Sequence, residues 1–225
     1  LTGSLATTAT KTTDVGNVAI TQGTLTNANN ANYDITYVNG ALTINKATLT
    51  VTADAKGMTY GDNSLPTLSA TITGFVNSQD LSTSGVSGAA SLSTTATAYN
   101  GTAGSASVVG AYTITPAVGT LAASNYDFSY VNGTLTVAKA NLTITASNDS
   151  KIYGATTTAA NIAYSSGVAT GVATGYSQVG LVNGDTISAV TLTSTGANAT
   201  STVASGPYTI TPSALTGSAR VIADN

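Results

Sequence analysis

The feature that most constrains the fold is an internal repeat with a spacing of 93 residues. Residues 32–53 read NYDITYVNGALTINKATLTVTA, and residues 125–146 read NYDFSYVNGTLTVAKANLTITA, with 15 of the 22 aligned positions identical. Tyr60-Gly61 recurs as Tyr153-Gly154 at the same spacing. Such self-similarity indicates tandem modules that share one fold.

A second motif shows that the copies differ in length. Gly74-Phe75-Val76-Asn77 recurs as Gly180-Leu181-Val182-Asn183, now at a spacing of 106 residues. The third copy therefore carries an insertion between its Tyr-Gly and Gly-Leu-Val-Asn motifs, which we place at residues 155–179.

The module boundaries are predicted from a change in the alternation of apolar residues. Leu42 and Ile44 occupy even positions, whereas Leu49 and Val51 occupy odd ones. A shift of one residue turns every side chain of a strand to the opposite face, so one strand cannot serve both pairs. We expect a break near Lys46-Ala47 and, by the same argument, near Lys139-Ala140.

These breaks divide the chain into three parts. Residues 1–46 are the C-terminal part of a repeat module, residues 47–139 a complete module, and residues 140–225 a third module that is C-terminally incomplete. The chain opens and closes partway through a module, so we expect it to be a piece of a longer protein. Linkers are nearly absent, which favours elongated, end-to-end stacking.

The secondary structure is expected to be all-β. Apolar residues alternate with Thr and Ser in short runs, and no run has the 3.6-residue period of a helix. We predict hairpins at Asn39-Gly40 and Asn132-Gly133, because Asn-Gly favours a type I′ turn. Six or seven strands in a module suit a small β-sandwich. An immunoglobulin-like sandwich is our first choice, and a β-grasp-like module with a short helix is the alternative.

Composition excludes most catalytic and metal chemistry. The chain has no Cys or His, and all nine acidic residues are Asp. General acid–base and nucleophilic catalysis use mainly His, Cys and tuned carboxylates. We therefore expect no enzyme activity, no catalytic residues, no metal site, no bound cofactor and no disulfide.

Charge and hydropathy exclude two further classes of partner. Six basic residues and a net charge of −3 leave no basic cluster for nucleic acid. No apolar run is long enough to cross a bilayer, and we expect no signal peptide within these residues. A surface of uncharged Thr, Ser, Asn and Gly suits a protein outside the cell.

Several motifs together resemble a known family. Tyr60-Gly61-Asp62, Gly74-Phe75-Val76-Asn77, Tyr112-Thr-Ile-Thr and Asn125-Tyr-Asp are similar to the MBG domain of YGX type, and the third copy is also similar to the related YDG repeat. Such repeats occur in large, filamentous-haemagglutinin-like adhesins of Gram-negative bacteria, often exported by two-partner secretion. The resemblance implies a secreted adhesin or biofilm-matrix protein.

Few residues suggest a binding site. Tyr164 and Tyr176, in the insertion, are the best candidates for stacking on a sugar. Lys46 and Lys139 invite comparison with isopeptide-forming lysines, but ordinary surface lysines fit better. The sequons at Asn100, Asn132, Asn141, Asn148 and Asn198 arise easily by chance in a Thr- and Asn-rich chain.

Two functions follow as hypotheses. The first is a non-catalytic structural stalk in a bacterial surface adhesin involved in cell adhesion. The second is a module that binds glycans or matrix polysaccharide through the third repeat. Expected partners are glycans of the host or the matrix, or neighbouring copies of the chain, at the bacterial cell surface.

Overall fold

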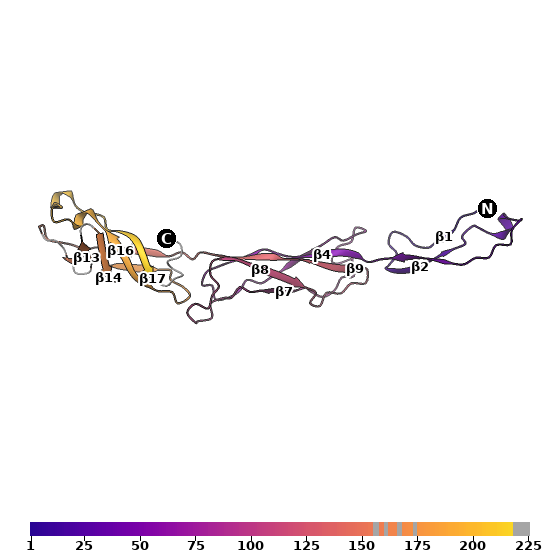
Figure 1. The fold of residues 1–225 in the computed structure, drawn as a ribbon, viewed down its shortest axis with the longest axis horizontal. Helices are drawn as coiled ribbons and strands as arrows, with labels where there is room; N and C mark the ends of the chain where they lie inside the picture. The colour runs from indigo at the N-terminus through magenta and orange to yellow at the C-terminus, as the bar shows by residue number, and fades with distance from the viewer. Residues whose placement is uncertain (155–157, 160–161, 166–167, 173–174, 218–225) are drawn as a thin grey trace. The chain divides into compact units, whose positions relative to one another are not determined.

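A computed structural model describes residues 1–154, 158–159, 162–165, 168–172 and 175–217 (Figure 1). The described residues form β-strands and three single-turn 3-10 helices (η1 Asn27–Asn29, η2 Thr195–Ala197 and η3 Val203–Ser205). No helix among them is long and apolar enough to cross a membrane. The expected all-β class and the division into several small sheets are confirmed.

The first repeat contains one antiparallel sheet. Its strand order is β1-β2-β3, with bounds β1 Ala6–Thr7, β2 Gly16–Thr21 and β3 Gly40–Ile44. Its burial is low, since Asn30 is the one buried residue in the range 1–46. This repeat has little core of its own.

The middle repeat contains two sheets. The first has the order β6-β4-β9, with bounds β4 Ala47–Ala53, β6 Ala70–Thr73 and β9 Tyr126–Val131. The second has the order β5-β10-β8-β7, with bounds β5 Lys56–Thr59, β7 Ser91–Thr94, β8 Gly110–Ala117 and β10 Gly133–Ala138. The strands β4 and β9 run parallel, with Ala47 opposite Tyr126 and Thr52 opposite Val131.

The third repeat also has two sheets. A two-stranded sheet pairs β11 Thr143–Ala146 with β15 Tyr176–Val179. A five-stranded sheet has the order β12-β13-β14-β16-β17, with bounds β12 Thr158–Ala159, β13 Ile162–Ser165, β14 Val168–Val172, β16 Ile187–Thr193 and β17 Thr211–Gly217. The insertion thus contributes strands to the sheet of its repeat.

The predicted hairpins do not form. Residues 33–39 are not in a strand, and β3 pairs with β2 instead. In the middle repeat, β9 and β10 lie in different sheets, so Asn132-Gly133 connects two sheets instead of two paired strands. Neither Asn-Gly pair has the positive φ angles that a type I′ turn requires.

The glycine of the second pair has a steric role instead. A Cβ atom at Gly133 would lie 2.4 Å from the carbonyl oxygen of Ala53. Ala53 ends β4, and the chain then enters β5 of the other sheet. Both chain segments therefore change sheet side by side, and the absence of a side chain at Gly133 permits their approach.

The strand breaks lie where the parity changes. β3 ends at Ile44 and β4 begins at Ala47, while β10 ends at Ala138 and β11 begins at Thr143. On β4 the odd positions Leu49, Val51 and Ala53 are buried, as the alternation requires.

By its contacts the chain divides into two compact units. The first comprises Leu1–Lys56, Thr67–Thr95 and Thr113–Thr134, and the second Gly57–Pro66, Ala96–Tyr112 and Leu135–Asn225. The first unit thus holds the contacts of the first repeat with the middle one, and the second those of the middle repeat with the third.

Each unit has its own buried residues. The first buries Leu49, Val51, Ala53, Ile114, Leu121 and Tyr126, and the second buries Met58, Ala96, Ala106, Leu135, Val137, Val190 and Leu192. In the first unit, the ring of Tyr126 meets Phe75 edge-on at a centroid distance of 6.0 Å. Its hydroxyl accepts from Val76 N and donates to Gln79.

Candidate functional site

The most elaborate polar cluster joins the middle repeat to the third. The amide of Asn183 donates to the hydroxyl of Tyr60 at 2.7 Å, and this hydroxyl donates to a carboxylate oxygen of Asp185 at 2.7 Å. Asn183 is 2% exposed and Asp185 9% exposed. We call the contacts of Tyr60–Gly61 and Ala103–Ala106 with Val182–Asp185 the second junction.

Asn183 is held on its other side by a loop of the middle repeat. Its side-chain oxygen accepts from Ala106 N at 3.1 Å, and its backbone oxygen accepts from Gly104 N at 2.9 Å. Its φ of 57° is in the left-handed region, which Asn tolerates better than most residues. The side-chain oxygen and the side-chain nitrogen of this buried amide are therefore both hydrogen-bonded across the junction, as buried polar groups require.

Two glycines allow the backbones to approach at the second junction. A Cβ atom at Gly61 would lie 2.4 Å from Val182, and one at Gly184 would lie 2.5 Å from Ala103. Gly61 belongs to the Tyr-Gly motif, and Gly184 follows the Gly-Leu-Val-Asn motif. These motifs therefore meet at a close contact between repeats.

The first repeat meets the middle one through an equivalent asparagine. Asn77, with φ of 56°, donates from its side chain to the backbone oxygen of Lys11 at 3.1 Å. Asn125 accepts from Val15 N at 3.0 Å and donates to Asp14 at 2.7 Å. We call these contacts the first junction.

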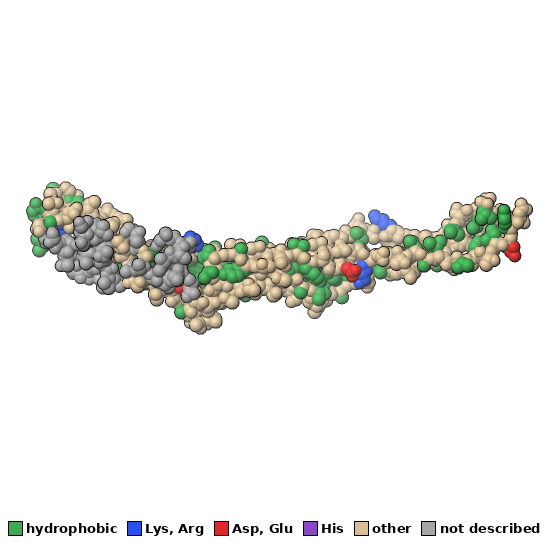
Figure 2. Space-filling view, in the orientation of Figure 1, with side chains coloured by type: hydrophobic (Ala, Val, Ile, Leu, Met, Phe, Trp, Pro, Cys, Tyr) green, Lys and Arg blue, Asp and Glu red, His purple; other side chains and the backbone are tan. Residues whose placement is uncertain are grey.

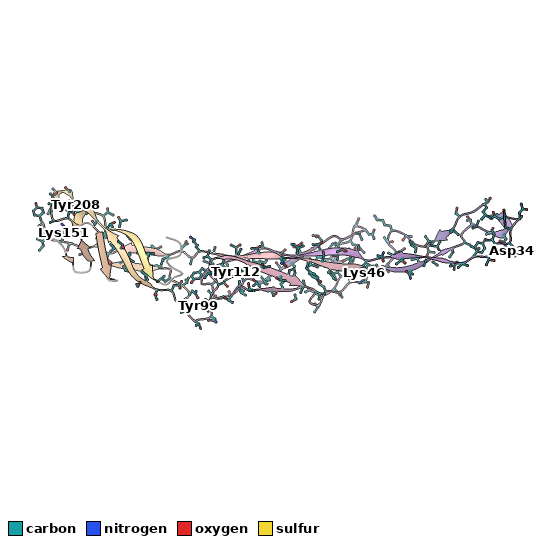
Figure 3. The ribbon with its side chains drawn as sticks, viewed as in Figure 1. Asp34, Lys46, Tyr99, Tyr112, Lys151 and Tyr208 are labelled. Carbon is teal, nitrogen blue, oxygen red and sulfur yellow. The ribbon has the colours of Figure 1, made fainter. Side chains whose placement is uncertain are left out.

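Lys46 lies beside the first junction as an exposed residue (Figure 3). Its ammonium group lies 3.5 Å from a carboxylate oxygen of Asp127 and 3.3 Å from the backbone oxygen of Ala123. Both side chains of the ion pair are substantially exposed, so it contributes little to stability. The interpretation of Lys46 as an ordinary surface lysine fits this geometry.

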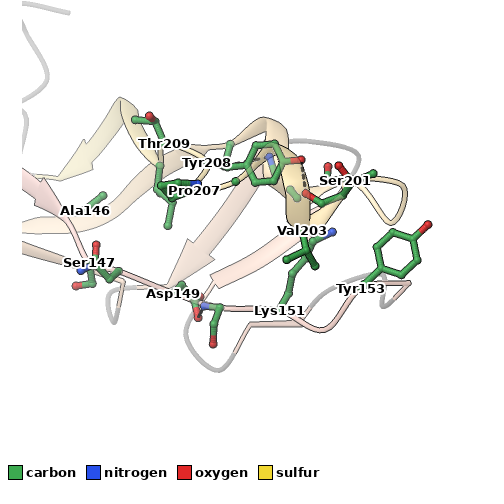
Figure 4. A pocket seen from close by; sticks show the side chains of 18 residues that line it. Ala146, Ser147, Asp149, Lys151, Tyr153, Ser201, Val203, Pro207, Tyr208 and Thr209 are labelled. Atoms are coloured by element: carbon green, nitrogen blue, oxygen red, sulfur yellow. Dashed lines mark hydrogen bonds between the residues drawn. The ribbon is translucent and has the colours of Figure 1, made fainter.

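The third repeat contains a pocket of about 690 Å³ (Figure 4). It lies between the segment Ala146–Lys151 with Tyr153 on one side and residues from Ser194 to Ile210 on the other. Tyr208 donates from its hydroxyl to the backbone oxygen of Thr202 at 2.9 Å, and the ammonium group of Lys151 donates to the backbone oxygen of Asn198. Tyr153 is 63% exposed at the pocket edge.

One polar atom of the pocket lining lacks a hydrogen bond. The Oδ2 atom of Asp149 is buried and has no partner among the described residues, while Oδ1 accepts from Ser150 N at 2.7 Å. The part of the chain that the structure describes contains no cluster of three acidic residues that would hold a metal ion. A donor from an incoming molecule would satisfy Asp149.

The surface elsewhere is uncharged over wide areas. Figure 2 shows mainly polar uncharged and hydrophobic side chains, with isolated charged groups. This agrees with a composition in which 7% of residues are charged.

The two tyrosines proposed for sugar binding have different positions. Tyr164 lies in β13, and its side chain lies outside the described residues. Tyr176 is partly buried against Val190 and Leu192, so part of its ring belongs to the core. A ligand role for either residue stays a prediction.

Sequence reasoning overlooked the junction residues. The Gly-x-Val-Asn motif was used only to locate the repeats, although an Asn that recurs next to Gly is a candidate for a left-handed, side-chain-bonded loop. Asp185 and the pocket gave no local signal, since both depend on contacts between distant segments.

Comparisons with known proteins agree with the repeat pattern. A family model described as the MBG domain (YGX type) matches residues 1–43, 49–136 and 142–220. No curated protein and no solved structure matches the chain.

Proposed function

Since the chain belongs to the MBG domain family (YGX type), with three consecutive matched segments, we propose that it is a non-catalytic stalk region of a secreted bacterial adhesin or biofilm-matrix protein. In this role the repeats hold a distal part of the parent protein away from the cell surface. The chain itself performs no chemistry.

The observation that carries this proposal is the second junction. A stalk transmits position only if consecutive repeats are fixed to each other, and a flexible linker would not do this. Tyr60, Asn183 and Asp185 form a bonded, largely buried chain of polar groups across the repeat boundary. Buried polar groups of this kind fix one geometry because leaving any of them unpaired is costly.

The first junction adds support because it uses the same motif. Asn77 and Asn183 occupy equivalent motif positions, have nearly the same φ, and each reach a loop of the preceding repeat. Because this asparagine contact recurs at both junctions, consecutive repeats are joined in a similar way, as a uniform stalk requires.

Solution scattering tests the mechanical part of this proposal. We expect the 225-residue chain to give an extended particle whose maximum dimension is the same at low and high ionic strength. A compact particle with the repeats folded back on one another would contradict a stalk.

Antibody labelling tests the proposed surface location. Antibodies against this chain should label intact cells that express the parent gene, and exclusively intracellular labelling would contradict surface localisation.

Glycan binding by the third repeat is the second candidate. The pocket lined by Tyr153 and Tyr208 favours it, because aromatic rings beside polar groups suit sugar recognition. Binding of a glycan that is lost when Tyr208 is replaced by Ala would support this function. If no glycan on a broad array binds and the particle is extended in solution, glycan binding is contradicted and the stalk function remains.

A further inference from the structure

The first and last segments of the middle repeat run in the same direction. β4 pairs with β9 in parallel, from Ala47 opposite Tyr126 to Thr52 opposite Val131. The pairing covers six residues of each strand without a register shift. β4 is the first strand of the repeat, and β9 leads directly into its last strand, β10. The chain therefore enters this pair at one end, at Ala47, and leaves it at the opposite end, at Val131.

The strands that follow repeat this arrangement. β5 follows β4 and lies beside β10, which follows β9. A Cβ atom at Gly57 would lie 3.9 Å from Thr136 O, and Tyr60 N donates to Ala138 O at 2.8 Å. These contacts advance along both strands together, so β5 and β10 also run parallel. Both pairs thus connect the beginning of the repeat with its end.

Tension along the chain acts on such a pair in shear. When two paired strands are pulled from opposite ends, they must slide past each other, and the evenly spaced bonds of a parallel pair are loaded together. When both strands are pulled from the same end, the strands peel apart and the bonds break one after another. Tension that enters β4 at Ala47 and leaves β9 at Val131 acts from opposite ends. The β4–β9 pair is therefore loaded in shear.

Burial keeps water away from the bonds of this pair. Leu49 and Val51 on β4 are 0% exposed, and Tyr126 on β9 is 1% exposed. The hydroxyl of Ser129 on β9 donates across the pair, with Leu49 O and Thr50 Oγ1 both at 3.2 Å. β4 is also the middle strand of its sheet, so β6 holds its other edge. Bonds to water can compensate for the lost bonds only after the strands have moved apart.

We propose that the middle repeat resists tensile force along the chain through the parallel β4–β9 pair. The pair breaks in one step, at a force well above that needed to peel two strands apart. This resistance is a property of the strand order, and its use in the cell rests on the proposed stalk function. Scattering tests the stalk and a force measurement tests the resistance, so either can fail without the other.

Single-molecule pulling with two handle geometries tests the proposal. The chain contains no Cys, so pairs of introduced cysteines fix DNA handles at chosen sites of the full chain. Lys46→Cys with Asn132→Cys pulls β4 and β9 from opposite ends, which is the shear geometry. Lys46→Cys with Ser124→Cys pulls them from the same end, which is the peeling geometry and the matched control. All three positions are exposed, and both variants lose the exposed ion pair of Lys46 with Asp127.

The two variants differ in the direction of loading and should not differ in stability. Urea unfolding should give both the same free energy of unfolding, because the substitutions are on the surface. Forced unfolding depends on the unfolding rate and not on this equilibrium value. At the same pulling speed, we expect the shear geometry to unfold in a single step at a force several times that of the peeling geometry. Equal forces in the two geometries, or a higher force in the peeling geometry, would overturn the proposal.

Discussion

At the scale of single residues, the carbonyl of Ala53 leaves no room for a side chain at Gly133. The two Asn-Gly glycines therefore differ in what they tolerate. A Cβ atom at Gly133 would lie 2.4 Å from the Ala53 oxygen, whereas one at Gly40 would make ordinary contacts of 3.7 Å with Ile20. The backbone that changes sheet at Gly133 cannot shift without disturbing β4.

The first prediction compares these two glycines. Gly133→Ala should lower the free energy of unfolding by about 1–3 kcal/mol through steric overlap. Gly40→Ala should change it by less than about 0.5 kcal/mol, as surface substitutions usually do. Urea denaturation followed by circular dichroism measures both. A Gly133→Ala variant as stable as Gly40→Ala would show that the close approach to Ala53 is unimportant.

Asp54 provides a second prediction at this scale. Hydrogen bonds from Ser69 at 2.6 Å and from Thr71 at 2.8 Å hold the pKa of its carboxyl group below its ordinary value, and nearby Lys56 adds to this. Because the pKa is lower in the folded state, Asp54 stabilises the fold above the unfolded-state pKa. This contribution is lost as the pH falls through the folded-state pKa.

Asp54→Asn should therefore lower the midpoint of thermal unfolding at neutral pH. The difference from the wild type should shrink as the pH falls below the ordinary carboxyl range. Asp34→Asn is the control, because Asp34 is exposed in a loop of the first repeat. A difference between Asp54→Asn and the wild type that does not change with pH would contradict a role for the charged carboxylate.

At the scale of elements, local patterns predicted strands better than strand partners. The alternation at Leu49 and Val51 predicted β4. The Asn-Gly signal was misleading because it is local, whereas β9 pairs with β4, about 80 residues earlier in the chain. Gly133 is needed for the close approach to Ala53, and no property of residues 126–138 alone shows this.

The candidate site was less accessible to sequence reasoning than the fold. The Tyr60-Gly61 motif marked the repeat, but nothing in its local sequence indicated that the hydroxyl of Tyr60 bonds Asn183 and Asp185 of the next repeat. Tyr60 lies more than 120 positions before Asn183 and Asp185 in the sequence. Their meeting depends on how the repeats stack, which the spacing of motifs alone does not determine.

The second junction gives the prediction at this scale. Tyr60→Phe removes the hydroxyl between Asn183 and Asp185 and should destabilise the second unit by about 1–3 kcal/mol, the cost of leaving buried polar partners unsatisfied. Tyr112→Phe is the matched control, because its hydroxyl donates to Val108 O at an exposed site within one repeat. Hydrogen exchange of the Gly104 and Ala106 amides should accelerate in Tyr60→Phe only. Unchanged exchange at both amides would contradict a stabilising role for this hydroxyl.

At the scale of the whole molecule, burial is distributed unequally among the repeats. The middle repeat has buried apolar residues on β4, β8 and β10, whereas residues 1–46 have no buried apolar side chain. Apolar burial supplies most of the favourable free energy of folding. A chain built in this way should open locally before it unfolds globally.

Deuterium exchange followed by mass spectrometry tests this gradient. Amides of β2 and β3 should exchange early, and those of β4 and β10 should exchange near the rate of global unfolding, because Leu49, Val51, Leu135 and Val137 are almost completely buried. Leu135→Ala should cost about 2–5 kcal/mol and accelerate exchange in β10, whereas Leu42→Ala, at the equivalent but exposed position, should cost much less. Equal protection of β3 and β10 would show that the first repeat folds as firmly as the middle one, so the unequal burial would not govern local opening.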